Sequence, residues 1–215
     1  MKKRNPCRFS IGLLAIVTAV TACQAIAEQG DWITRAGFAN VNPDASSDVL
    51  DLDVDDNSQI GLTLTYMMTD NIGVELLAAT PFEHDITSDG LGLKVGSAKH
   101  LPPTLNLQYY FLGSNSQFRP YAGIGLNYTV FWDEDTAGEF EAAAGNSSLS
   151  LDDSCGLSLQ LGADFQIDDK WLINGSVWKL RISSDATAKT ANLGRVDIDV
   201  DIDPWVYMIG IGYRF

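Results

Sequence analysis

The stretch Gln59-Ile60-Gly61-Leu62-Thr63-Leu64-Thr65-Tyr66 alternates strictly between polar or small side chains and apolar ones. Because successive side chains of a β-strand point to opposite faces, this period of two is typical of a strand with one apolar face. The polar turn Thr69-Asp70-Asn71 follows, and the alternation resumes from Ile72 to Ala78. The stretch therefore predicts an antiparallel hairpin.

The same alternation recurs along the chain. It is clear in segments 104–111, 121–130 and 157–165, and less regular in 31–41, 171–183 and 196–215. With the first hairpin these make eight strands. Short links (68–71, 112–117, 168–170) alternate with long ones (42–57, 82–99, 132–153, 184–195). This pattern predicts an all-β fold, an eight-stranded antiparallel up-and-down transmembrane β-barrel with short periplasmic turns and long extracellular loops.

The polar face of the strands distinguishes a membrane barrel from a soluble one. It is rich in Gly, Thr, Gln and Asn rather than in the Lys and Glu of a solvated exterior, which suits a hydrogen-bonded lumen. Aromatic residues gather near the strand ends, like the girdles of membrane barrels. They are Tyr66, Tyr109, Phe111, Tyr128, Phe131, Trp132, Phe165, Trp171, Trp205 and Tyr213. The alternative is a soluble sandwich with these aromatics in its core.

The N-terminus has the three parts of a secretory signal peptide. A basic start is followed by the apolar run 11–22 and the cleavage site Ala25-Ile26-Ala27. The predicted domains are a signal peptide, 1–27, and an outer-membrane β-barrel domain, 28–215. A lipoprotein box ending at Cys23 is the alternative. Cleavage after Ala27 removes four basic residues from a chain of net charge −14, which leaves −18, and leaves one cysteine, Cys155, too few for an internal disulfide.

Composition excludes some classes of protein. Asp and Glu outnumber Lys and Arg 28 to 14, so the chain lacks the basic footprint of a nucleic-acid binder. Hydrophobic residues make up 46% and aromatics 10% of the chain, which argues against global disorder. We expect the acids to lie in loops outside the bilayer.

The chain ends on an aromatic residue in Gly210-Ile211-Gly212-Tyr213-Arg214-Phe215. This end resembles the C-terminal signal by which the bacterial assembly machinery recognises outer-membrane barrels, with Gly210, Tyr213 and Phe215 as its main residues.

Several stretches resemble the outer membrane protein W (OmpW) family. They are Lys99-His100-Leu101-Pro102-Pro103-Thr104 with Gln108-Tyr109-Tyr110-Phe111, the run from Thr69 to Phe82, Arg119-Pro120-Tyr121-Ala122-Gly123, Asp203-Pro204-Trp205 and the C-terminus. The resemblance implies a barrel in the outer membrane of a Gram-negative bacterium, with a narrow apolar channel that passes small hydrophobic molecules. It also implies a constriction at Leu77 and Cys155. A tryptophan is usual in the family where Cys155 stands, so the sequence does not determine how tightly this constriction closes.

Strand phase suggests what lines the lumen. Leu77 shares the inward face of Glu75, as a channel-lining residue or as ordinary packing of a filled barrel. The last strand adds an apolar inner wall, made of Val196, Ile198, Val200, Ile202, Val206 and Met208. A polar floor is expected from four charged residues that pair as buried ions must, namely Arg35, Glu75, Asp164 and Arg214.

Two acidic ladders lie on alternate positions, Asp197-Asp199-Asp201-Asp203 and Asp51-Asp53-Asp55 with Asp56. Charge is costly at mid-bilayer, so both are expected beyond the lipid. They form a solvated rim or bind divalent cations, and no loop spacing matches an EF-hand.

These features favour passive uptake of small hydrophobic molecules. We expect no enzyme, cofactor or metal site, because no H-E-x-x-H, G-x-S-x-G or phosphate loop is present. His84 beside Asp85 is an ordinary loop residue or, alternatively, a catalytic residue of a lipid-modifying barrel enzyme. Expected partners are outer-membrane lipid and lipopolysaccharide, small hydrophobic ligands and the outer-membrane assembly machinery, with no nucleic acid. The second hypothesis is a non-transporting surface protein whose acidic loops bind cations, phage or host factors.

Overall fold

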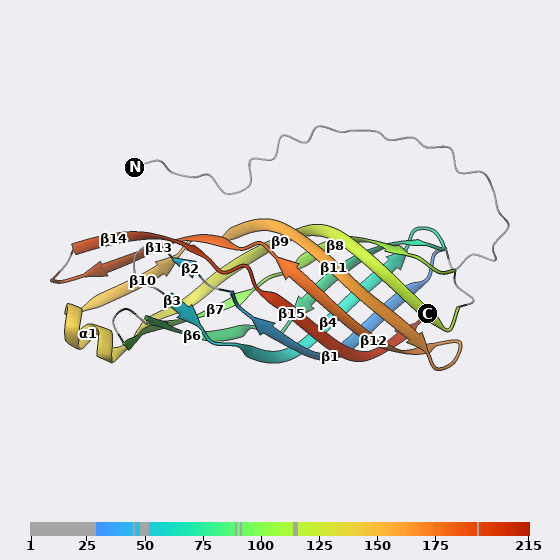
Figure 1. Cartoon of the computed structure of the whole chain (residues 1–215), viewed down its shortest axis with the longest axis horizontal. Coiled ribbons are helices and arrows are strands. Elements are labelled where there is room, and N and C mark those ends of the chain that lie inside the picture. Colours follow the sequence, from blue (N-terminus) through green and yellow to red (C-terminus); the bar gives the residue numbers. More distant parts are fainter. Residues whose placement is uncertain are drawn as a thin grey trace, which may run out of the picture.

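A computed structural model of the chain describes residues 29–44, 46–47, 52–88, 90, 92–113, 116–192 and 194–215. The strands form an elongated wall that closes into a barrel at one end and continues into an extension at the other (Figure 1). The predicted signal peptide, 1–27, and Asp51 lie outside the described residues. Within the described part of the chain, no helix is long and apolar enough to cross a membrane.

Eight antiparallel strands close the barrel, as the alternation predicted. Each pairs with its neighbour in chain order, and the last returns to pair with the first. The strands are β1 (Trp32–Asn42), β4 (Asn57–Met67), β5 (Ile72–Ala79), β8 (Thr104–Tyr110), β9 (Phe118–Thr136), β11 (Ser154–Gln166), β12 (Trp171–Leu180) and β15 (Trp205–Arg214).

The seam between the first and last strands requires glycine. Gly37 of β1 lies opposite Gly210 of β15. A Cβ added to Gly37 would lie 2.1 Å from the carbonyl oxygen of Ile209, and one added to Gly210 would lie 2.3 Å from that of Ala36. A larger residue at either position would push the two strands apart, so Gly210 has a structural role at this seam.

The barrel is apolar outside and polar inside, which confirms the predicted assignment of the two faces. Phe38, Leu161 and Ile209 are 75%, 61% and 66% exposed. The inward positions of the barrel strands hold fully buried polar side chains, such as Thr65 of β4 and Asn106 and Gln108 of β8. A soluble barrel would show the reverse, because its apolar face forms the core. Among the predicted girdle aromatics, Phe131 is the exception, since it is buried in the interior against His100.

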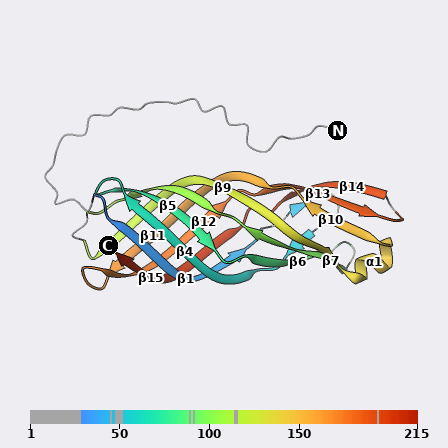
Figure 2. The same ribbon diagram turned by 180° about the vertical axis from the view of Figure 1, so that it is seen from behind.

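The long connections are largely strands, not loops. They form β2 (Ser46–Ser47), β3 (Leu52–Val54), β6 (Phe82–Ser88), β7 (Leu93–Leu101), β10 (Ser147–Leu151), β13 (Ser183–Thr190) and β14 (Gly194–Asp201). β7 pairs with the outer part of β9, so the barrel wall continues, while β10, β13, β14 and β2 form a second sheet. Figure 2 shows this extension at the end opposite the short turns and the C-terminus. The inward side chains of β13 are Ser, Ala and Thr, which gave too weak an apolar alternation for the sequence to reveal a strand.

The connection between β9 and β10 contains a short helix, α1 (Gly138–Ala144), with Ala137 as its N-cap, and Thr136 donates a hydrogen bond to Glu141 at 3.0 Å. The end of the chain differs from the prediction. The expected single last strand is two strands, β14 and β15. It breaks at Asp203, which has a φ of 32°, and at Pro204, which has no N–H to donate.

Candidate functional site

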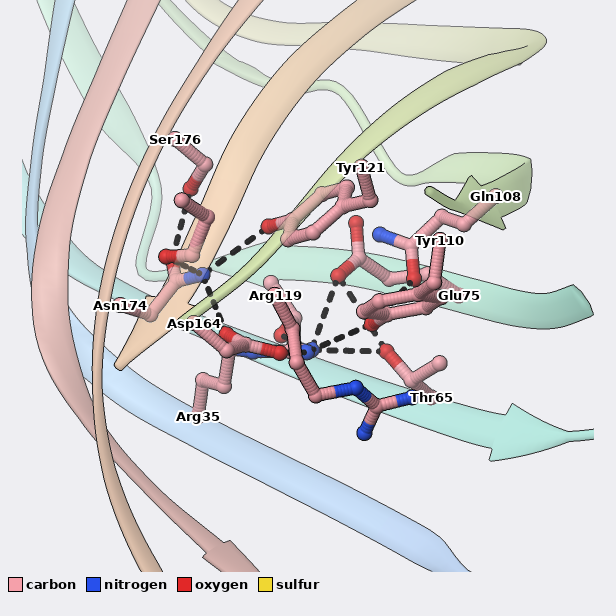
Figure 3. A network of polar contacts seen from close by, with 12 residues as sticks. Arg35, Thr65, Glu75, Gln108, Tyr110, Arg119, Tyr121, Asp164, Asn174 and Ser176 are labelled. Atoms are coloured by element: carbon pink, nitrogen blue, oxygen red, sulfur yellow. Dashed lines mark hydrogen bonds and ion pairs between the residues drawn. The ribbon is translucent and has the colours of Figure 1, made fainter. Parts of the chain in front are cut away.

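The periplasmic half of the barrel is filled by a buried polar plug around Arg35 of β1 (Figure 3). The Arg35 guanidinium donates two hydrogen bonds to the carboxylate of Asp164, from Nε at 2.9 Å and from Nη2 at 2.6 Å. Its Nη1 lies 3.3 Å from Oε2 of Glu75. All three side chains are 0–1% exposed. One cation thus joins strands β1, β5 and β11 across the lumen.

Neutral side chains donate further hydrogen bonds to both carboxylates. Gln160 donates to Oε1 of Glu75 at 2.8 Å, and Asn174 donates to Oδ1 of Asp164 at 2.8 Å. Arg35 also donates to the hydroxyls of Thr65 and Tyr110, each at 2.8 Å. Such full pairing is what permits charges in a dry interior, because an unpaired buried ion costs several kcal/mol.

Three of the four charged residues of this plug, Arg35, Glu75 and Asp164, are those predicted from the sequence. Arg214 does not belong to it: it lies at the periplasmic end of the barrel, 3.5 Å from Asp31, with 21% of its side chain exposed. The fourth is Arg119, which was not predicted; it is 1% exposed and lies with its guanidinium carbon 4.6 Å from the ring centre of Tyr110. Arg119 sits on β9, whose inward phase at Tyr121 was the available signal. The two arginines match the charge of Glu75 and Asp164.

An apolar cluster lies next to the plug on its outer side. We call it the inner cluster, and its buried members are Ala39, Val41, Leu77, Phe82, Phe131, Trp178, Leu180, Ile182, Val206 and Met208. Trp178 and Leu77 are 0% and 4% exposed. Trp178 was not predicted as an inward residue, although it shares the phase of Asn174, just as Leu77 shares that of Glu75.

Cys155 does not join Leu77, which corrects the expected constriction. It pairs across strands with Tyr128, which is 43% exposed on the outer face, and it shares the phase of exposed Leu157. Its neighbour Ser154, 3% exposed, takes the inward position. The tryptophan of the inner cluster is Trp178 of β12.

The predicted apolar inner wall faces the interior on both parts of the split strand. Val206 and Met208 of β15 lie in the inner cluster. Ile198 and Val200 of β14 are each 6% exposed in a cluster with Ala186. Val196 and Ile202 are partly buried against that cluster.

Beyond the inner cluster, the extension encloses an apolar cavity of about 70 Å³, called the outer cavity below. Helix α1 covers one side of it with Phe140, and β13 and β14 form another side. The lining residues are Pro43, Val54, His84, Ile86, Val95, Ala98, His100, Phe131, Phe140, Leu149, Leu151, Ala186, Ala188, Ile198, Val200 and Ile202. Phe131, Leu151 and Ile202 also pack in or against the inner cluster, so the two apolar regions are continuous.

The two histidines stack on each other in the wall of this cavity. Their ring centres are 4.9 Å apart, and Phe82 and Phe131 pack on His100. Burial lowers the pKa of His84 and lowers that of His100 to about 3, so both rings are neutral at pH 7. His84 is 4% exposed and is thus no ordinary loop residue, while its neighbour Asp85 pairs with Lys94 at 2.8 Å.

The described residues of the acidic ladders lie on the outer surface of the extension. Asp197 accepts a hydrogen bond from Arg195 at 2.8 Å, and this contact lowers the pKa of its carboxyl. Within the described ranges, no group of three or more His, Cys, Asp or Glu side chains has the arrangement of a metal site.

The C-terminal residues of the predicted assembly signal belong to β15 and its end. Tyr213 packs on Trp171 with ring centres 4.9 Å apart, and Phe215, 63% exposed, exchanges backbone hydrogen bonds with Trp32. The outward face of β15 is thus apolar down to the last residue.

Comparison with known proteins identifies the family. The model of the OmpW family matches residues 28–215. The chain belongs to the OmpW family. It is 49% identical to outer membrane protein W of Vibrio cholerae, over 94% of this chain and 97% of that one. The crystal structure of OprG from Pseudomonas aeruginosa matches with a TM-score of 0.81 and 46% identity, over 86% of this chain and 96% of that one.

A more distant OmpW relative carries a metabolic name. The dibenzothiophene metabolism operon protein PahQ of Pseudomonas aeruginosa is 28% identical, over 88% of this chain and 90% of that one. The relatives from Vibrio cholerae and Escherichia coli are each named outer membrane protein W, and OprG is an outer membrane protein of known structure, so this chain is an outer-membrane barrel of the same family.

Proposed function

We propose that this OmpW-family barrel is a passive conduit for small hydrophobic molecules. The observation that carries the proposal is the continuous apolar interior, which runs from the outer cavity into the inner cluster and ends on the plug around Arg35. Transfer of apolar surface from water into such a space is favourable by about 25 cal/mol of free energy per Å². A hydrophobic molecule that enters from outside is therefore stabilised along the apolar interior as far as the plug.

The name of the relative PahQ agrees with this substrate class, because dibenzothiophene is a hydrophobic aromatic compound. No chemical step is proposed, since the interior is apolar and its histidines pack on aromatic rings.

The route out is proposed to run sideways into the membrane. The plug closes the lumen with paired ions, which an apolar molecule cannot replace. Beside the inner cluster, strand pairing stops at Leu77 opposite Thr104 and begins again at Phe82 opposite His100. Pro81, Pro102 and Pro103 lie in this interval, and proline has no N–H for a ladder hydrogen bond. We place the exit at this interruption of the wall.

A charge in the inner cluster tests the conduit. Leu77→Asp or Met208→Asp is expected to lower uptake of a hydrophobic probe into proteoliposomes about tenfold or more, because an unpaired carboxylate in an apolar path is costly. Leu77→Met, which keeps the path apolar, is the control and should retain uptake. Unchanged uptake in both Asp variants, with the barrel folded, would reject the conduit.

A bulky residue at the interruption tests the route. Ala79 packs partly buried against the inner cluster, whereas its neighbour Ala78 shares the outward phase of Leu76. Ala79→Trp is expected to lower uptake several-fold by filling the exit, while Ala78→Trp, the matched control facing lipid, leaves it unchanged. Equal uptake by the two variants would mean that molecules leave elsewhere.

The partners proposed for the outer surface follow from its polarity. The apolar belt of the barrel would contact outer-membrane lipid and lipopolysaccharide, and the outward face of β15, ending at Phe215, would be read by the assembly machinery.

A further inference from the structure

One polar atom of the outer cavity stands out. Apart from His84 and His100, every residue that lines the cavity is apolar. Nδ1 of His84 is hydrogen-bonded to the backbone carbonyl of Asp55. Nε2 of the same ring is buried and has no hydrogen-bond partner among the described residues. The two ring nitrogens point in nearly opposite directions, so Nε2 is turned away from the carbonyl of Asp55, in the link between β3 and β4.

The anchoring bond fixes what Nε2 can do. A carbonyl oxygen only accepts hydrogen bonds, so Nδ1 carries the proton. The ring is neutral at pH 7, because burial lowers its pKa more than Asp55, Asp56 and Asp85 raise it. Nε2 is therefore a lone-pair acceptor, and a buried acceptor without a donor is costly. A ligand that donates a hydrogen bond to Nε2 of His84 would remove this cost.

We propose that the outer cavity prefers hydrophobic alcohols and phenols to hydrocarbons of the same size, because their hydroxyl donates a hydrogen bond to Nε2 of His84. Hydrocarbons and ethers have no proton to donate. Ammonium groups do, but a cation is expelled from apolar surroundings. A neutral hydroxyl on an apolar body satisfies both the acceptor and the lining.

The inner cluster holds the complementary group. Nε1 of Trp178 is a buried donor that has no hydrogen-bond partner within the described part of the chain. A hydroxyl both donates and accepts, so the same ligand satisfies His84 in the cavity and Trp178 further in. An ether oxygen would satisfy only Trp178. This inference rests on the proposed conduit, whose substrate class it narrows.

The test compares three ligands with the same number of non-hydrogen atoms, 1-octanol, heptyl methyl ether and n-nonane. Their binding to the full chain in lipid nanodiscs is measured for the wild type and for His84→Phe, which keeps a ring but removes the acceptor. Because each ligand is compared between two proteins, its partition into lipid cancels. Octanol should bind about tenfold more weakly to the variant, while the ether and nonane change by less than about twofold.

A second readout uses the wild type alone. Octanol, but not the ether or nonane, should shift the side-chain ¹⁵N resonance of His84 Nε2, because it forms a new hydrogen bond to that atom. This measurement does not depend on whether the His84→Phe variant folds. Ile86→Val, which alters the same cavity wall without an acceptor, is the matched control and should change all three affinities alike.

The outcomes separate this inference from the conduit itself. If all three ligands bind and octanol shows no dependence on His84 and no shift of Nε2, the alcohol preference is rejected and the conduit stands. If none of the three binds to the wild type, both are rejected.

Discussion

The plug and the outer cavity lie in one continuous β-wall, yet their interiors are opposite. The plug is polar, with Arg35 paired with two carboxylates, while the cavity is apolar and, among its described lining residues, has one buried acceptor without a hydrogen-bond partner, Nε2 of His84. The outer surfaces are reversed as well: Ile209 and Ile211 face outward on β15, whereas Asp197, Asp199 and Asp201 do so on β14. The change occurs around Pro204, within one stretch of chain.

The reversal follows from the solvent outside. Around the barrel the surroundings are hydrocarbon, so apolar side chains face outward and polar ones pair within. Around the extension the surroundings are water, so the wall follows the rule of a soluble β-protein, with an apolar inside. The outward residues therefore indicate whether lipid or water surrounds the wall, and the inward residues indicate whether the interior is polar or apolar.

The largest expected effect comes from removing the cation of the plug. Arg35→Met leaves Glu75 and Asp164 buried without their partner, and should lower the free energy of unfolding by about 3–5 kcal/mol, measured by urea unfolding in lipid vesicles. Arg214→Met is the control, because its ion pair with Asp31 lies at the barrel end and should contribute less than about 1 kcal/mol. Equal losses would mean that the plug is not what stabilises the barrel interior.

A smaller and local effect is expected in the cavity at acid pH. The pKa of His100 in the folded chain is about 3, below its unfolded value near 6.5, so the unfolded segment binds more protons. The contribution to stability is therefore complete above pH 6.5 and is lost as the pH falls toward 3, by on the order of a few kcal/mol. The amide protection factors of β6 and β7, which correct for the slower intrinsic exchange in acid, should fall at pH 4 relative to pH 7, while those of β1 and β4 stay constant.

His100→Phe separates this cause from general acid damage. The variant keeps an aromatic ring against Phe82 and Phe131 and removes the proton site. Its acid-induced loss of protection in β6 and β7 should be smaller than in the wild type. An undiminished loss of protection would mean that protonation of His100 is not the cause.

The sequence by itself determined the eight barrel strands, their short turns and the outward apolar face. These are local properties, because a period of two over about ten residues specifies both the strand and its two faces. The same phase argument correctly turned Leu77, Met208 and Glu75 inward.

Only the tertiary structure decided which inward residues meet. Arg35 and Asp164 are 129 residues apart, and closure of the barrel between β1 and β15 brings them to 2.6 Å. It was also the fold that placed Trp178 rather than Cys155 beside Leu77, and Arg214 away from the plug. The outer cavity is formed by the long connections between barrel strands, whose apolar alternation is too short and too polar to be recognised in the sequence. Each strand of the extension has few apolar side chains and buries them only against the other strands of the extension.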